Sequence, residues 1–124
     1  MPETEIVFFL ENNKTIPALD WIRGLSTKAQ IKCLARIERL GERGHELRRP
    51  EVDYLRDGIY ELRIGLQGQN YRLLYFFFGD SIAVLSHGLV KERRVPPKEI
   101  DNAIERKAQF ESDPTTHTYR MEVE

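Results

Sequence analysis

The sequence is poor in thiols and in clustered histidines, and both shortages exclude common metal sites. One cysteine, Cys33, occurs in 124 residues, so neither an internal disulfide nor a thiolate-only metal site is possible within the chain. The three histidines, His45, His87 and His117, lie far apart, with no carboxylate or thiolate at ligand spacing. We therefore expect no metal or other cofactor, and we expect Cys33 to be a small core residue.

Long apolar runs and nucleophile motifs are missing as well. No run approaches the roughly 20 apolar residues of a membrane-spanning helix, and residues 1–5 lack the basic start and apolar middle of a signal peptide. There is no glycine-rich phosphate loop, no serine or cysteine nucleophile signature and no carboxylate pair in an apolar setting. We expect a soluble cytoplasmic protein without membrane contact, and no hydrolysis through a metal or a covalent enzyme intermediate.

A strong charge of either sign is also missing, because the net charge is −1. The charge is nevertheless uneven: residues 1–19 carry −2, residues 111–124 carry −3, and residues 20–110 carry +4. This distribution is compatible with an ordinary solvated surface and with a basic face that binds an anion. Charge alone does not decide between them.

The most apolar stretch spans residues 70–78 and reads NYRLLYFFF. Gly79-Asp80 ends it, and a second apolar run over 81–90 follows at once. Two β-type runs joined by Gly-Asp predict a hairpin. Apolar residues occupy both alternating sets of positions in the first run, which is typical of a central strand buried on both faces.

Helical patterns flank this hairpin. Pro17 is placed to begin a helix that ends near Gly24, and Ser26 is a good N-cap for a second helix over 27–43. An apolar residue recurs every three positions in the second helix, which predicts that one set faces the core: Ile31, Leu34, Ile37 and Leu40. The other expected elements are strands over 5–10 and 59–66, an irregular connection over 44–58, and a helix over 98–110.

This order of elements predicts an α+β fold. We expect a small, mostly antiparallel sheet with an N-terminal helical hairpin on one face and a C-terminal helix, and we expect the first strand to pair with the last. A single domain over 1–111 would hold these elements. Residues 112–124 are expected to form a flexible tail, because they lack the apolar content to pack alone.

Positive side chains stand on three neighbouring strands of the predicted sheet. Arg63 precedes the turn, Arg72 follows it, and Lys91, Arg93 and Arg94 come where the next strand ends. A guanidinium group binds phosphate through two hydrogen bonds and keeps its charge. RNA carries its own nucleophile, the ribose hydroxyl, so a cationic site needs only positioning, charge stabilisation and proton transfer to cleave it.

The arginines also have a structural interpretation. Arg72 can be paired with Glu61 or Asp57, Arg63 can be a structural arginine of the same kind, and the cations over 91–94 can be a solvated strand end.

The aromatic residues leave two interpretations open in the same way. Tyr60, Tyr71 and Tyr75 are either core residues or base-stacking platforms. His87 is either a satisfied core histidine or a proton-transfer group.

Four segments together resemble one family of toxins. They are LRDGIYELRI (55–64), NYRLLYF (70–76), HGLVK (87–91) and PKEIDNAIERK (97–107). In this order they are similar to the phage-derived HigB branch of the RelE/ParE superfamily, and the similarity covers nearly the whole chain before the tail.

The resemblance implies the toxin of a type II toxin–antitoxin pair. Such a toxin is an mRNA interferase, a metal-independent endoribonuclease that inhibits translation and arrests growth by cutting messenger RNA in the ribosomal A site. Arg72 is then the phosphate clamp, Arg63 the basic residue of the preceding strand, and Lys91 or Arg93 that of the last strand's end. Arg93, Arg94, Tyr60 and Tyr71 are the candidate RNA-binding residues. The implied partner is a cognate antitoxin, a small helix-turn-helix protein of the HigA type.

The chain departs from the family pattern at three points. RelE-type members carry a second basic residue two positions before Arg63, where Glu61 stands here, and a tyrosine after the final basic cluster, where this chain has VPP (95–97). Family toxins are also often strongly basic. The proton-transfer group is therefore open, with His87, Tyr71 and Lys91 as candidates.

Two other functions fit the same fold. One is a non-cleaving binding module, either an inactive toxin or a regulatory partner, which the departures at Glu61 and at the missing tyrosine favour. The other is the gyrase-poisoning activity of the ParE branch, which the HigB-type segments make the weaker alternative.

Overall fold

The computed structural model describes residues 3–90 and 93–121 and holds one six-stranded sheet between helices. The strands are β1 (Glu5–Phe9), β2 (Val52–Arg56), β3 (Ile59–Leu66), β4 (Gln69–Phe78), β5 (Ile82–Val90) and β6 (Thr118–Tyr119). The helices are α1 (Pro17–Arg23), α2 (Thr27–Arg43), the short 3₁₀ turn η1 (Gly44–Glu46) and α3 (Pro97–Ser112).

The sheet confirms the predicted α+β class and its mostly antiparallel pairing. Its strand order is β2-β3-β4-β5-β1-β6. All neighbours are antiparallel except β1 and β5, which run parallel with Val7 opposite Val84. The expected pairing of the first strand with the last strand of the hairpin is therefore confirmed.

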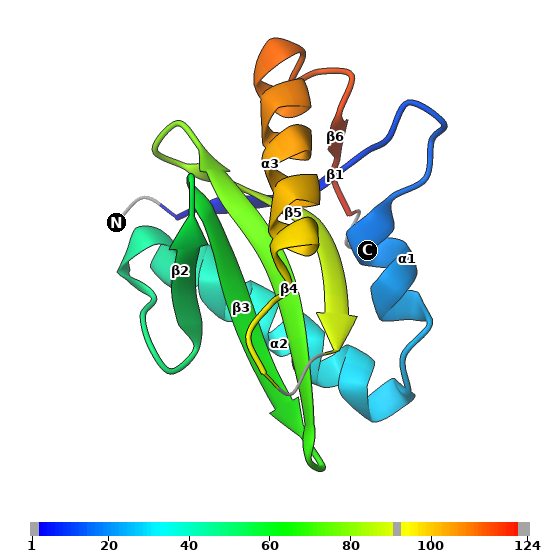
Figure 1. Ribbon diagram of the computed structural model, residues 1–124, viewed down its shortest axis with the longest axis vertical. Helices are drawn as coiled ribbons and strands as arrows, with labels where there is room; N and C mark the ends of the chain where they lie inside the picture. Colours follow the sequence, from blue (N-terminus) through cyan, green and yellow to red (C-terminus); the bar gives the residue numbers. More distant parts are fainter. Residues whose placement is uncertain (1–2, 91–92, 122–124) are drawn as a thin grey trace.

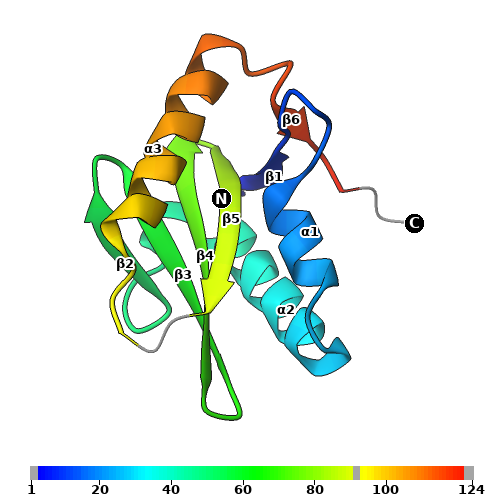
Figure 2. The same ribbon diagram turned by 45° about the vertical axis from the view of Figure 1, so that its right-hand side comes forward.

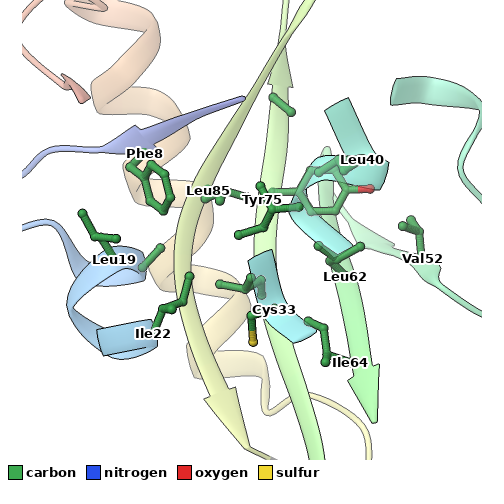
Figure 3. Close-up of a cluster of buried hydrophobic side chains, with 14 of the residues drawn as sticks. Phe8, Leu19, Ile22, Cys33, Leu40, Val52, Leu62, Ile64, Tyr75 and Leu85 are labelled. Atoms are coloured by element: carbon green, nitrogen blue, oxygen red, sulfur yellow. The ribbon is translucent and has the colours of Figure 1, made fainter. Parts of the chain in front are cut away.

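Helices cover both faces of the sheet. Figure 2 shows the sheet between α3 on one side and α1 and α2 on the other. In Figure 1 the sheet is seen face-on, with α3 in front of it and α2 behind. We call these the α3 face and the α1/α2 face. The core of the α1/α2 face gathers residues from α1, α2 and the central strands, among them Leu19, Cys33, Leu62 and Tyr75 (Figure 3). Val84, Ile100 and Phe110 belong to the core of the α3 face.

Local sequence signals account for the helix ends. The hydroxyl of Ser26 accepts a hydrogen bond from the N–H of Ala29 at 3.2 Å, as an N-cap does. Gly44 ends α2 with φ +53° and donates its N–H to the carbonyl of Leu40. At Gly88 a side chain would meet the Trp21 ring at 2.1 Å, so the absence of a Cβ lets α1 lie close against β5.

The apolar face of α2 differs from the one predicted. Ile31 is 63% exposed and Leu34 is 40% exposed, whereas the small residues Ala29 and Cys33 are fully buried. Ile37 and Leu40 are buried as expected. A helix close to a sheet leaves room only for small side chains at its nearest positions, so the size of the residue, and not only its polarity, decides which face turns inward.

Two other expectations are corrected. Residues 44–58 contain an edge strand, β2, which pairs with β3 through Asp53 opposite Glu61 and Tyr54 opposite Tyr60. The predicted tail over 112–124 begins with the last residue of α3 and then returns to the sheet. His117 is 6% exposed and stacks on Phe9, while β6 pairs with β1, so β1 supplies the apolar contacts that the tail itself lacks. Residues 122–124 lie outside the described part.

In the described residues, no helix is both long enough and apolar enough to cross a membrane.

The orientation of α2 can be tested with two truncations to alanine. Leu40 has no exposed surface, so Leu40→Ala should lower the free energy of unfolding by about 2–5 kcal/mol. Ile31→Ala, at a position that is 63% exposed, should change it by no more than about 0.5 kcal/mol. Urea denaturation of both variants measures the difference, and a larger loss for Ile31→Ala would contradict the observed orientation.

Candidate phosphate-binding site

Two arginines stand directly opposite each other on the central strands. The register of β3 and β4 pairs Arg63 with Arg72, so both side chains project from the α3 face. Arg63 leaves 38% of its side chain exposed, whereas Arg72 leaves 10%. Like charges in directly opposite positions repel each other, so this pair requires a compensating anion.

Glu61 is that anion. Its Oε1 accepts a hydrogen bond from Arg72 Nη1 at 3.0 Å, and its Oε2 accepts from Arg63 Nη2 at 3.0 Å and from Arg63 Nε at 3.2 Å. Glu61 is 2% exposed, and the Nε of Arg72 is buried without a hydrogen-bond partner among the described atoms. One carboxylate therefore holds both guanidinium groups, and Arg72 adopts the pairing with Glu61 that the structural interpretation of the sequence named.

The cluster continues to the sheet edge through Asp53 of β2. Asp53 Oδ2 accepts from Arg63 Nη2 at 3.0 Å, and Asp53 also binds Arg49 through bonds of 3.0 and 3.1 Å. The hydrogen bond from Arg49, supported by the nearby charge of Arg63, lowers the pKa of the Asp53 carboxyl below its ordinary value. Three arginines face two carboxylates, so the cluster of Arg49, Asp53, Glu61, Arg63 and Arg72 carries a net charge of +1.

The connection from β5 to α3 brings two more cations. Arg93 and Arg94 are exposed, whereas the next residue, Val95, is 4% exposed and belongs to the core of the α3 face. Val95 therefore anchors the connection at the face that carries Arg63 and Arg72. Lys91, which the sequence placed in the site, lies outside the described residues.

His87 lies on the same face but is held in a network of its own. Its Nδ1 lies 3.0 Å from Arg106 Nη1 and 2.8 Å from the Ser86 hydroxyl, and its Nε2 lies 2.9 Å from Glu99 Oε1. A guanidinium group only donates, so Nδ1 accepts and Nε2 carries the proton that it donates to Glu99. Burial lowers the pKa of His87, which favours this neutral form. Both ring nitrogens are engaged, so proton transfer by His87 would require one of these bonds to break.

The predicted RNA-binding tyrosines do not join the arginines. Tyr60 and Tyr71 project from the α1/α2 face, where Tyr60 stacks on Tyr75 at 5.4 Å and Tyr71 packs edge-on against Trp21 at 6.1 Å. Successive side chains of a strand point to opposite faces. Tyr60 is three residues from Arg63 on β3, and Tyr71 is next to Arg72 on β4, so each tyrosine lies on the face opposite its arginine.

Sequence reasoning missed part of this cluster. On sequence grounds Glu61 departs from the family pattern and is a possible partner of Arg72, and its spacing of two from Arg63 is the signal for a shared strand face. The sequence predicts an irregular connection around Asp53 and Arg49, because nothing in residues 44–58 alternates clearly enough to predict β2. In the part of the chain that the structure describes, no three His, Cys, Asp or Glu side chains gather as a metal site would require.

Comparison with known families gives one match that covers most of the chain. A family described as "Phage derived protein Gp49-like (DUF891)" matches residues 20–108, which include α2, the four strands β2 to β5 and most of α3. A search among curated proteins finds no significant match.

The buried ion pair can be tested by a double-mutant cycle. Glu61→Gln should lower the free energy of unfolding by about 3–5 kcal/mol, because it leaves the buried Arg72 without its counter-charge. Arg72→Met should lower it by about 1–3 kcal/mol, because Glu61 keeps Arg63 and loses only the donor to its Oε1. The double variant should lose less free energy of unfolding than the two single variants together, as measured by urea denaturation. Arg49→Ala is the control, since that side chain is 75% exposed and its ion pair lies at the surface. Strictly additive losses would contradict the coupling between Glu61 and Arg72.

The neutral state of His87 predicts a dependence of stability on pH. As the pH falls below about 6.5, histidine in the unfolded chain takes up a proton, whereas His87 in the folded chain resists it because its pKa is lowered. Stability should therefore fall between about pH 7.5 and about 5.5, and this fall should be smaller in His87→Gln. The exposed His45 provides the control variant His45→Gln. Thermal unfolding across this range measures the effect, and an equal fall in wild type and His87→Gln would contradict it.

Proposed function

The chain belongs to the Gp49-like family of phage-derived, toxin-like proteins, and on this basis we propose that it is the toxin of a type II toxin–antitoxin pair. Its proposed activity is that of a HigB-like mRNA interferase of the RelE type, which cuts messenger RNA on the ribosome in the cytoplasm, inhibits translation and arrests growth. The observation that carries the proposal is the pair of opposed arginines, Arg63 and Arg72, on one sheet face.

The geometry supports different roles for the two arginines in phosphate binding. Arg63 is the more exposed arginine, so its guanidinium group is the one that we assign to the scissile phosphate. Arg72 is nearly buried and shares Glu61 with Arg63, so it positions Arg63 through that carboxylate and adds positive charge behind the phosphate. We assign the exposed Arg93 and Arg94 to neighbouring phosphates of the same RNA strand.

The proposed reaction needs no metal. The ribose 2′ oxygen attacks the adjacent phosphorus, a bond from phosphorus to the 2′ oxygen forms, and the bond to the 5′ oxygen breaks. The 2′ hydroxyl loses a proton and the 5′ oxygen gains one, which leaves a 2′,3′-cyclic phosphate and a free 5′ hydroxyl. Negative charge builds up on the phosphoryl oxygens in the transition state, and fixed guanidinium groups stabilise it.

A second candidate function is a non-cleaving binding module. Glu61 and Asp53 already neutralise most of the charge of Arg63 and Arg72, so a phosphate must compete with two carboxylates for Arg63. A module that binds a partner without chemistry has no need for free cations. The observed pairing favours this alternative, and family membership favours the toxin.

A cognate antitoxin is part of the proposal, because a domain that stops translation must be held inactive in its own cell. A helix-turn-helix protein of the HigA type is the partner that the resemblance favours. Co-expression of the chain with the product of the adjacent reading frame, followed by purification, tests whether the two form a complex.

The toxin proposal can be tested with two arginines of the same strand pair. Arg63→Ala should reduce the rate of message cleavage on translating ribosomes by about 10²–10³-fold and relieve growth arrest, since one donor to the transition state is lost. Arg56→Ala is the matched control: Arg56 lies on the adjacent strand β2, has similar exposure and pairs with Asp57 and Asp101 instead. Arg56→Ala should cleave the message at the wild-type rate.

Three outcomes would contradict the proposal in different ways. Equal rates of cleavage by Arg63→Ala and wild type would show that Arg63 does not bind the scissile phosphate. An intact message at every concentration of wild type would favour the binding module. Growth arrest with an intact message and altered DNA supercoiling would point to gyrase poisoning.

A further inference from the structure

A pocket opens at the β2 edge, beside the arginine cluster. Its volume is about 360 Å³, within the range of small-molecule sites. Its lining includes residues of the η1–β2 connection together with Tyr54 and Tyr60. The residues that bear on its chemistry are His45, Arg48, Arg49, Asp53, Tyr54 and Tyr60. The mechanism proposed above uses none of their aromatic rings.

Two aromatic residues of the pocket, His45 and Tyr54, are exposed and held in place by their neighbours. Tyr54 is 53% exposed, packs edge-on against Tyr60 at 5.0 Å, and accepts a hydrogen bond on its hydroxyl from the N–H of Gly58 at 3.0 Å. The exposed His45 stacks on Phe77 with ring centroids 3.6 Å apart. A large aromatic side chain that is fixed yet half exposed offers a ready face for a planar ring.

The pocket also connects to the phosphate-binding site through one carboxylate. Arg49 Nη2 and Arg63 Nη2 lie 3.1 and 3.0 Å from the same atom, Asp53 Oδ2, so the two nitrogens are at most 6.1 Å apart. Arg49 lines the pocket, whereas Arg63 lies on the α3 face. Arg48, which is exposed, adds a second cation at the pocket wall. A chain with a phosphate on Arg63 can therefore pass over the β2 edge and reach the pocket.

We infer that this pocket holds an unpaired base of single-stranded RNA that flanks the phosphate on Arg63. The base stacks on Tyr54, and Arg48 and Arg49 contact the phosphate that belongs to it. Tyr60 packs edge-on against Tyr54 and supports it, which gives one of the predicted RNA-binding tyrosines an indirect role. Stacking accepts every base, so the pocket contributes affinity and register more than sequence preference. The inference rests on RNA being the substrate, as proposed above.

The test measures binding of a fluorescein-labelled, eight-nucleotide 2′-O-methyl RNA, which lacks the attacking hydroxyl and is not cleaved. Tyr54→Ala should weaken binding by about 5- to 150-fold, the equivalent of the roughly 1–3 kcal/mol of one stacked base. Tyr54→Phe keeps the ring and should recover most of this loss. Arg48→Ala should weaken binding and lower the slope of affinity against salt by about one charge. Arg23→Ala, an exposed arginine at the end of α1, is the control and should keep the wild-type slope.

The outcomes separate this inference from the proposed function. Unchanged RNA binding in Tyr54→Ala, together with weakened binding in Arg63→Ala, would contradict base binding in the pocket and would leave the nuclease proposal standing. No binding and no cleavage by wild type would overturn both. If Tyr54→Ala fails to fold, photo-crosslinking of wild type to an oligonucleotide with one 4-thiouridine decides the matter. Crosslinks within residues 45–54 support the pocket, and crosslinks confined to other segments overturn it.

Discussion

A buried ion pair in the middle of the sheet, between Glu61 and Arg72, fixes the geometry of the arginine cluster. Two charges are taken out of water there, and the cost of desolvating them is offset only because each guanidinium and carboxylate group finds a partner. The strong apolar burial of the surrounding strand, with Leu73, Leu74 and Phe76 fully buried, stabilises the fold enough to keep the pair there. The same carboxylate then fixes the direction of Arg63. A structural ion pair and a candidate binding site are therefore one arrangement of side chains.

That arrangement has opposing effects on function. Glu61 and Asp53 hold Arg63 in place, which lowers the entropy lost when a phosphate binds. They also compete with the phosphate, because they occupy the guanidinium nitrogens that would contact it. In the proposed site, two features outside the cluster would favour phosphate binding: the exposed cations Arg93 and Arg94, and the aromatic pocket, which would add binding energy for a flanking base. A site of this kind is expected to bind RNA weakly as a free strand and to depend on several contacts at once.

Much of the fold could be predicted from local patterns, and the limits of that prediction have physical causes. The run over 70–78 predicted a central strand because its two faces are both apolar, and Ser26 marked the start of α2. The inward face of α2 could not be predicted from its apolar spacing, because close packing on the sheet selected the small residues Ala29 and Cys33. The edge strand β2 and the return of residues 113–119 to β1 depend on long-range pairing that no local pattern records. For the site, strand alternation places Arg63 and Glu61 on one face, but only the cross-strand register brings Arg72 and Asp53 to them.

Nuclear magnetic resonance of the arginine side chains can decide whether Arg63, positioned by Arg72 through Glu61, is the phosphate contact of an RNA-binding site. The measurement follows the Nε–H signals of a labelled sample during titration with a non-cleavable 2′-O-methyl oligonucleotide. Arg63 should shift most, Arg72 should shift with it because Glu61 joins them, and Arg56 should stay unchanged. Binding of the oligonucleotide with no change at Arg63 and Arg72 would contradict the account.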